Sequence, residues 1–113
     1  MRIGRVYDPV ESGCYRVLAD RIWPRGLRKD DPRTGRWWPA LAPSNDLRRW
    51  YGHEPDRFEE FASRYRAELE SGEGAQALTD LRALAADGEV MLVTATKDLD
   101  HSHLAVLVEV VQE

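Results

Sequence analysis

Short apolar stretches interrupted by polar residues begin the chain, and residues 3–7 and 15–19 predict two β-strands. Both stretches are rich in β-branched or aromatic residues, which is typical of strands. The link between them contains Pro9 and Gly13 and is too short for a helical crossover, so we expect antiparallel neighbours. A third apolar run, at residues 90–94, lies between polar flanks and predicts a strand buried on both faces.

Helical periodicity dominates the second half of the chain. Residues 44–46 supply Ser, Asn and Asp side chains that can cap a short helix running through Trp50. Apolar residues recur at helical spacing over residues 55–69, 73–86 and about 100–112, which predicts three further helices.

This order of elements predicts one α/β domain over residues 1–113, with a small mixed, mostly parallel sheet flanked by helices. A strand, a helical crossover and a further strand normally run parallel, so residues 15–19 and 90–94 should end at the same edge of the sheet. Ligands of open α/β sheets bind outside that carboxyl edge. We therefore expect residues 20–25 to lie beside residues 94–103.

Between the second strand and the first helix, residues 21–43 are irregular and rich in proline and glycine. A loop of this length in a compact domain is often functional. The end of the strand and the start of this loop supply a carboxylate, two guanidiniums and an indole, from Asp20, Arg21, Arg25 and Trp23. This combination predicts a site for an anionic ligand, with a phosphate-bearing molecule as one candidate.

The composition and charge of the chain argue against some classes of protein. No apolar run approaches the roughly 18 to 20 residues that cross a bilayer, so we expect no membrane association. The single cysteine, Cys14, fits a cytoplasmic protein. The net charge of −4 hides an asymmetry: residues 1–66 hold fourteen basic and ten acidic side chains, and residues 67–113 hold two and ten. An acidic chain argues against general binding of duplex nucleic acid.

Two blocks of the sequence identify a family. The segments DRIWPRG and APSNDLRRWYGH, followed by VTATKD and a histidine, resemble the YeaO-like branch of the domain-of-unknown-function family 488. The resemblance covers nearly the whole chain and implies a single-domain bacterial α/β protein, without supplying a substrate. Other branches carry a cysteine near the end of the third strand, where this chain has Thr94, Ala95 and Thr96, so thiol chemistry is not expected here. The matching positions are Asp20, Arg21, Trp23, Pro24, Arg25, Gly26, Pro43, Ser44, Leu47, Arg48, Trp50, His53, Lys97, Asp98 and His101.

From these residues we assign candidate roles. Arg21, Arg25 and Lys97 would hold negative charge, and Trp23 and Trp50 would wall the pocket. Asp98 and His101 would orient the ligand or move a proton, since an imidazole titrates near neutral pH. The expected ligand-binding set is Asp20, Arg21, Trp23, Arg25, Arg48, Trp50 and Lys97, and the candidate catalytic pair is Asp98 and His101.

Structural alternatives stay open for these residues. Arg21 could pair with Asp20 or Asp98 to close the end of the strand, and His101 could hydrogen-bond without catalysing anything. The soft or imidazole ligands are Cys14, His53, His101 and His103, and their spacing matches no recognised metal site, so we expect neither metal nor cofactor.

Two other functions compete with anion binding. The arginine- and tryptophan-rich residues 21–51, which include Trp37 and Trp38, could bind nucleic acid or a protein partner. Alternatively, the charged groups could pair with one another in a scaffold that binds no ligand.

Overall fold

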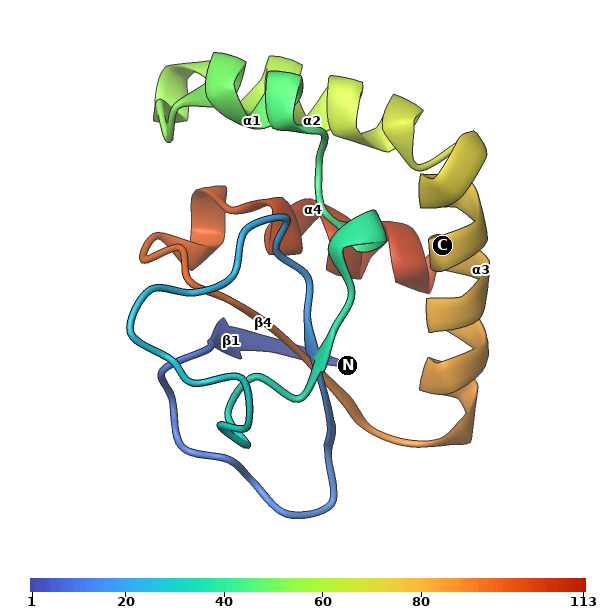
Figure 1. The fold of residues 1–113 in the computed structure, drawn as a ribbon. Helices are drawn as coiled ribbons and strands as arrows, with labels where there is room; N and C mark the ends of the chain where they lie inside the picture. The colour runs from blue at the N-terminus through green and yellow to red at the C-terminus, as the bar shows by residue number, and fades with distance from the viewer.

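A computed structural model describes all of residues 1–113 and contains a four-stranded parallel sheet with four α-helices (Figure 1). The strands are β1 (Arg2–Arg5), β2 (Tyr15–Leu18), β3 (Arg36–Trp37) and β4 (Val90–Thr94). The helices are α1 (Asn45–Tyr51), α2 (Phe58–Glu68), α3 (Gly72–Asp87) and α4 (His103–Gln112). The short 3₁₀ helices are η1 (Pro39–Leu41), η2 (Pro55–Arg57) and η3 (Leu99–His101). None of the helices has the length and apolar character that crossing a bilayer requires.

The order of the strands, β1-β4-β2-β3, corrects one prediction. The first two strands are not antiparallel neighbours, because β4 lies between them and pairs in parallel with both. Residues 6–14 can return the chain to the start of β2 without a helix: nine extended residues reach about 30 Å, and a four-residue strand needs only about 13 Å. The predicted parallel crossover from β2 to β4 is confirmed, and the sheet is wholly parallel rather than mixed.

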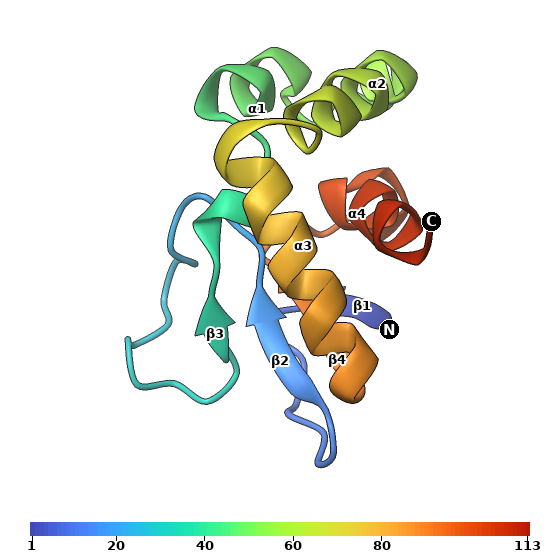
Figure 2. The same ribbon diagram turned by 90° about the vertical axis from the view of Figure 1, so that its right-hand side faces the viewer.

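Successive side chains of a strand point to opposite faces of the sheet, so the buried apolar residues form two clusters, one on each face. Val17 and Leu92 face the main core, where they meet apolar side chains of all four helices. The helices α3 and α4 lie against the sheet, and α1 and α2 form a further layer over α4 (Figure 2). Leu18 and Val93 face the other way, into a small cluster that the long loop covers with Trp23. The strand β4 is therefore buried on both faces, as predicted.

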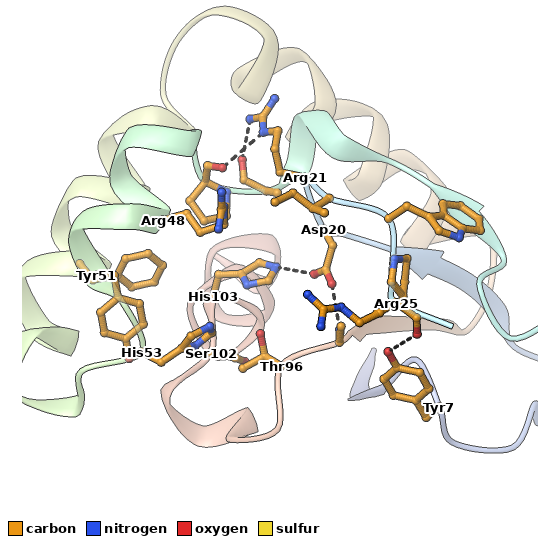
Figure 3. A pocket seen from close by; sticks show the side chains of 17 residues that line it. Tyr7, Asp20, Arg21, Arg25, Arg48, Tyr51, His53, Thr96, Ser102 and His103 are labelled. Atoms are coloured by element: carbon orange, nitrogen blue, oxygen red, sulfur yellow. Dashed lines mark hydrogen bonds and ion pairs between the residues drawn. The ribbon is translucent and has the colours of Figure 1, made fainter. Parts of the chain in front are cut away.

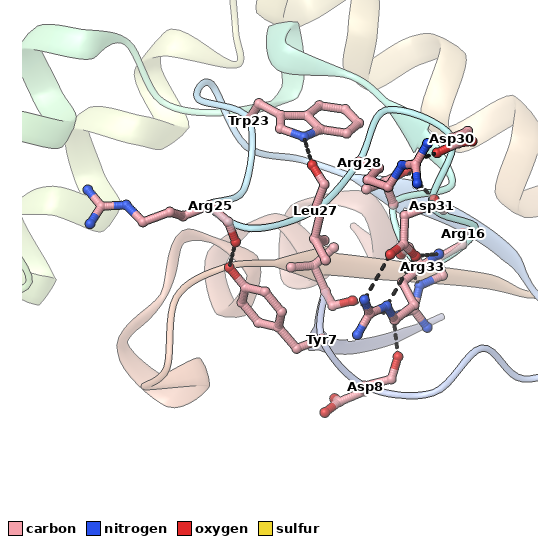
Figure 4. Close-up of polar contacts among 12 residues, drawn as sticks. Tyr7, Asp8, Arg16, Trp23, Arg25, Leu27, Arg28, Asp30, Asp31 and Arg33 are labelled. Atoms are coloured by element: carbon pink, nitrogen blue, oxygen red, sulfur yellow. Dashed lines mark hydrogen bonds and ion pairs between the residues drawn. The ribbon is translucent and has the colours of Figure 1, made fainter.

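A buried arginine on β2 fastens the loops that cover this second face. The Arg16 side chain is almost fully buried. Its guanidinium donates to the carbonyl oxygens of Arg33 at 2.5 Å and Asp8 at 2.8 Å, and to further carbonyls of residues 5, 6 and 9 (Figure 4). Burial lowers the pKa of Arg16, but no carboxylate lies in direct contact with it. Five backbone carbonyls from two separate loops thus converge on one side chain.

Gly35 allows this arrangement. Its φ of 58° is left-handed, and an added Cβ would lie 2.2 Å from the Arg16 carbonyl oxygen. Only glycine fits that approach, because any side chain would collide with the backbone of β2.

Replacing Arg16 by methionine tests whether its hydrogen bonds hold these loops in place. We expect Arg16→Met to lower the free energy of unfolding by about 3 kcal/mol or more, since each buried carbonyl left without a donor costs about 1–3 kcal/mol. Urea denaturation measures the change. Arg2→Met, at a half-exposed position of β1, is the matched control and should cost under about 1 kcal/mol. Equal stability of Arg16→Met and the parent protein would show that the carbonyls find other donors.

Candidate functional site

A cavity of about 270 Å³ lies at the carboxyl edge of the sheet, where β2 and β4 end (Figure 3). Residues 20–25 form one wall, and α1 with the turn after it forms the opposite wall. Residues that follow β4 and begin α4 close the space between the two walls. The cavity therefore occupies the place that the parallel topology predicts for a ligand site.

The two segments expected to meet at this edge are in direct contact. The Asp20 carboxylate accepts a hydrogen bond from the backbone N–H of Ala95 at 2.8 Å. His103, the first residue of α4, places Nε2 at 2.6 Å from the Ala19 carbonyl oxygen and 3.4 Å from Asp20 Oδ1. Three elements that are far apart in the sequence are joined here by one carboxylate and one imidazole.

The contacts of His103 define its hydrogen-bonding state. A carbonyl oxygen can only accept, so Nε2 carries a proton and donates it to Ala19. Nδ1 makes no hydrogen bond within the protein. Three side-chain polar atoms are sealed from solvent and also lack a partner, namely Arg5 Nε, Asp20 Oδ1 and Arg48 Nε, and Nδ1 is not one of them. His103 therefore lines the cavity with one ring nitrogen, Nδ1, that has no partner in the protein.

Two opposing effects act on the Asp20 carboxyl, which is largely buried. Burial by itself disfavours the charged form, but the hydrogen bond and charge of His103 and the Ala95 N–H outweigh it, and the pKa of Asp20 falls below its usual value. Asp20 is thus ionised at neutral pH, and its charge faces His103.

Two arginines lie on the facing walls with no partner in the protein (Figure 3). Arg48 projects from α1 and is half-buried, and its Nε is sealed from solvent without an acceptor. Arg25 is exposed, and neither guanidinium takes part in an ion pair or stacks on an aromatic ring. The Arg25 backbone is held by the Tyr7 hydroxyl, which donates to its carbonyl oxygen at 2.9 Å.

Arg21 has a different role from Arg25. Its guanidinium donates to the Ala42 carbonyl at 3.0 Å and forms an ion pair with Glu73 at 3.1 Å. It also approaches the Pro43 carbonyl at 3.4 Å. These bonds use most of its donors to attach the loop to the start of the helical layer, so Arg21 lines the cavity chiefly as a support.

Trp23 lines the cavity from the wall formed by residues 20–25. Its indole N–H donates to the Leu27 carbonyl at 2.8 Å, and its ring meets Trp37 edge to face at 5.3 Å. Trp38 is buried beneath the Arg36 guanidinium. Trp50 lies outside the cavity lining, between the guanidiniums of Arg57 and Arg64. The four tryptophans do not gather on one surface.

Three other predicted residues also lie outside the cavity lining, namely Lys97, Asp98 and His101. His101 Nδ1 lies 2.8 Å from Asp98 Oδ2, and both side chains are substantially exposed. Asp98 also accepts from the His101 backbone N–H and begins η3. A hydrogen bond from the His101 side chain lowers the pKa of Asp98. The pair forms a local turn, and its suggested part in catalysis stays a prediction.

Several residues that line the cavity have no role in the prediction from sequence. One is His103, although its place at the expected start of a helix after β4 points toward the sheet edge. His53 follows Gly52 and has a left-handed φ of 57°, which turns the chain after α1 toward the cavity. Thr96 and Ser102 bring hydroxyl groups. No group of three or more His, Cys, Asp or Glu side chains is placed to hold a metal ion.

Replacing Asp20 by asparagine tests the link between the two strand ends. We expect Asp20→Asn to cost about 2 kcal/mol at pH 7, since an amide NH₂ would face the His103 N–H and the charge-assisted bonds are lost. A lowered pKa stabilises the fold above the unfolded value near 3.9 and loses that contribution as the pH falls through the folded value. The cost should therefore shrink below about pH 4 in urea titrations. Asp46→Asn, at a fully exposed carboxyl, should show no such pH-dependent difference.

Comparison with known proteins places the chain among uncharacterised bacterial relatives. It is 49% identical over 110 residues to the uncharacterized protein Rv3073c of Mycobacterium tuberculosis, covering 96% of this chain and 91% of that protein. It is 36% identical over 106 residues to the uncharacterized protein YeaO of Escherichia coli, covering 93% of this chain and 90% of that protein. No solved structure matches the chain. The family model described as the inactive DUF488-N3 subclade matches residues 1–113, and the chain belongs to that family.

Proposed function

We propose that this protein binds a small anionic ligand in the cavity at the carboxyl edge of its sheet. The observation that carries the proposal is the pair of guanidiniums, Arg25 and Arg48, which line facing walls and have no partner in the protein. Other arginines of the chain have carboxylate, carbonyl or aromatic partners, as Arg16, Arg33 and Arg64 do.

The energetics favour an anion at this place. A sealed donor without an acceptor, such as Arg48 Nε, costs about 1–3 kcal/mol, and a ligand oxygen would remove that cost. The planar fork of a guanidinium matches the oxygens of a phosphate or a carboxylate. The one carboxylate in the cavity, Asp20, contacts His103 at 3.4 Å and forms no ion pair with either arginine.

We propose that the protein binds this ligand without catalysing a reaction on it. The family to which the chain belongs is described as inactive. The segment Thr94-Ala95-Thr96, at the end of β4, carries no thiol. Neither Asp98 nor His101 lines the cavity. A ligand-binding protein needs none of these groups as a nucleophile or a base, and the single cysteine is compatible with the cytoplasm as its compartment.

Anion binding can be measured by titration calorimetry and by the rise in melting temperature with sodium phosphate, against sodium chloride at equal ionic strength. Arg25→Ala and Arg48→Ala should each weaken phosphate binding about 10-fold or more, because a hydrogen bond to a charged group contributes about 1.5–3 kcal/mol. The shift in melting temperature should shrink accordingly.

Two neighbouring arginines serve as matched controls. Arg49 follows Arg48 on the same helix and pairs with Asp46, and Arg28 lies three residues after Arg25 and pairs with Asp30. Neither lines the cavity. Arg49→Ala and Arg28→Ala should leave phosphate affinity within about twofold. Equal losses in all four variants would indicate general attraction to a basic surface and would contradict a defined site.

A further inference from the structure

The size of the cavity carries information about the ligand. Each water in the liquid occupies roughly 30 Å³. A cavity of about 270 Å³ is therefore much larger than a bare oxyanion, which replaces only a few waters. The volume is close to the lower end of pockets that hold organic ligands, about 300 Å³.

Part of the lining is apolar. Ile22 and Pro24 contribute from the wall formed by residues 20–25, and Pro43 and Phe61 contribute from the helical side. The Phe61 ring stacks on Tyr51, with centroids 4.2 Å apart and planes 17° apart, and both residues line the cavity. These side chains offer aromatic and aliphatic contact, which suits a flat, apolar group.

The charge of the cavity distinguishes between kinds of anionic group. Neither Arg25 nor Arg48 forms an ion pair within the protein, and Asp20 contacts His103 rather than either arginine. Two guanidiniums without an ion-pair partner complement the charge of a phosphate monoester, which lies between about −1.5 and −2 at neutral pH, better than the single charge of a carboxylate.

Resting on the anion-binding function above, we propose that the ligand is a phosphate monoester whose organic group is flat and apolar. The phosphate lies between Arg25 and Arg48. The organic group lies against the side chains of Ile22, Tyr51 and Phe61. His103, whose Nδ1 has no partner in the protein, lines the same cavity.

Calorimetric titration of the full chain with phenyl phosphate, inorganic phosphate and benzoate tests this assignment. Phenyl phosphate should bind at least about 10-fold more tightly than either of the other two, because it alone satisfies both the cations and the apolar wall. Benzoate binding as tightly as phenyl phosphate would overturn the choice of a phosphate.

A variant at an exposed position separates the apolar wall from the cations. Ile22 is 56% exposed, so Ile22→Ser should leave the fold intact. It should weaken phenyl phosphate about threefold or more and leave inorganic phosphate unchanged. Val10 is 49% exposed and lies outside the cavity, and Val10→Ser should change neither affinity.

The outcomes distinguish this inference from the proposed function. Equal affinity for inorganic and phenyl phosphate, with both lost in Arg48→Ala, would overturn the organic ligand and leave anion binding standing. Failure of both phosphates to bind would overturn both proposals.

Discussion

One carboxylate, that of Asp20, holds the edge of the sheet together. It follows β2, accepts from the backbone after β4 and faces the imidazole at the start of α4. A buried carboxylate is costly unless it is hydrogen-bonded, and Asp20 keeps its bond from the Ala95 N–H and its contact with His103 only while these three segments stay together. The electrostatics of this single group thus fix the relative positions of loops that the strands alone would leave adjustable.

The second constraint lies on the opposite side of the sheet. Arg16 gathers carbonyl groups from the turn after β1 and from the loop before β3, and Gly35 lets that loop approach the strand closely. With the loop held in this way, the Trp23 ring can cover the small cluster around Leu18. The wall of the cavity that carries Arg25 is therefore supported by the interior of the protein, although Arg25 itself is exposed.

Much of the fold follows from the sequence, since the periodicity of residues 55–69, 73–86 and about 100–112 predicts helices and the apolar run at 90–94 predicts the central strand. The order of strands does not follow, because a nine-residue link can either close a hairpin or return the chain for a parallel strand. In the structure β4 lies between β1 and β2 and pairs in parallel with both. The sequence could not show this, since β1 and β2 have similar patterns whichever strand they pair with.

The cavity lies at the sheet edge where the sequence predicts a site, and only some of the predicted residues line it. Topology placed residues 20–25 beside the end of β4, and contacts of Asp20 with Ala95 and His103 agree with that placement. Which side chains face the cavity depends on where a 3₁₀ turn ends: η3 turns His101 toward Asp98 at the surface, and His103 is turned inward two residues later. A difference of two residues at a helix start is finer than sequence periodicity resolves.

The shortness of β3 has a consequence for how molecules of this protein behave toward one another. An outer strand displays unsatisfied peptide groups that can recruit a strand from another chain. Here the outer strand has only two residues, and Pro39, which lacks an N–H, follows soon after. At the opposite border, Arg2 places its charge beside Glu11 and Glu89. Both borders thus disfavour edge-to-edge pairing with a strand of another chain.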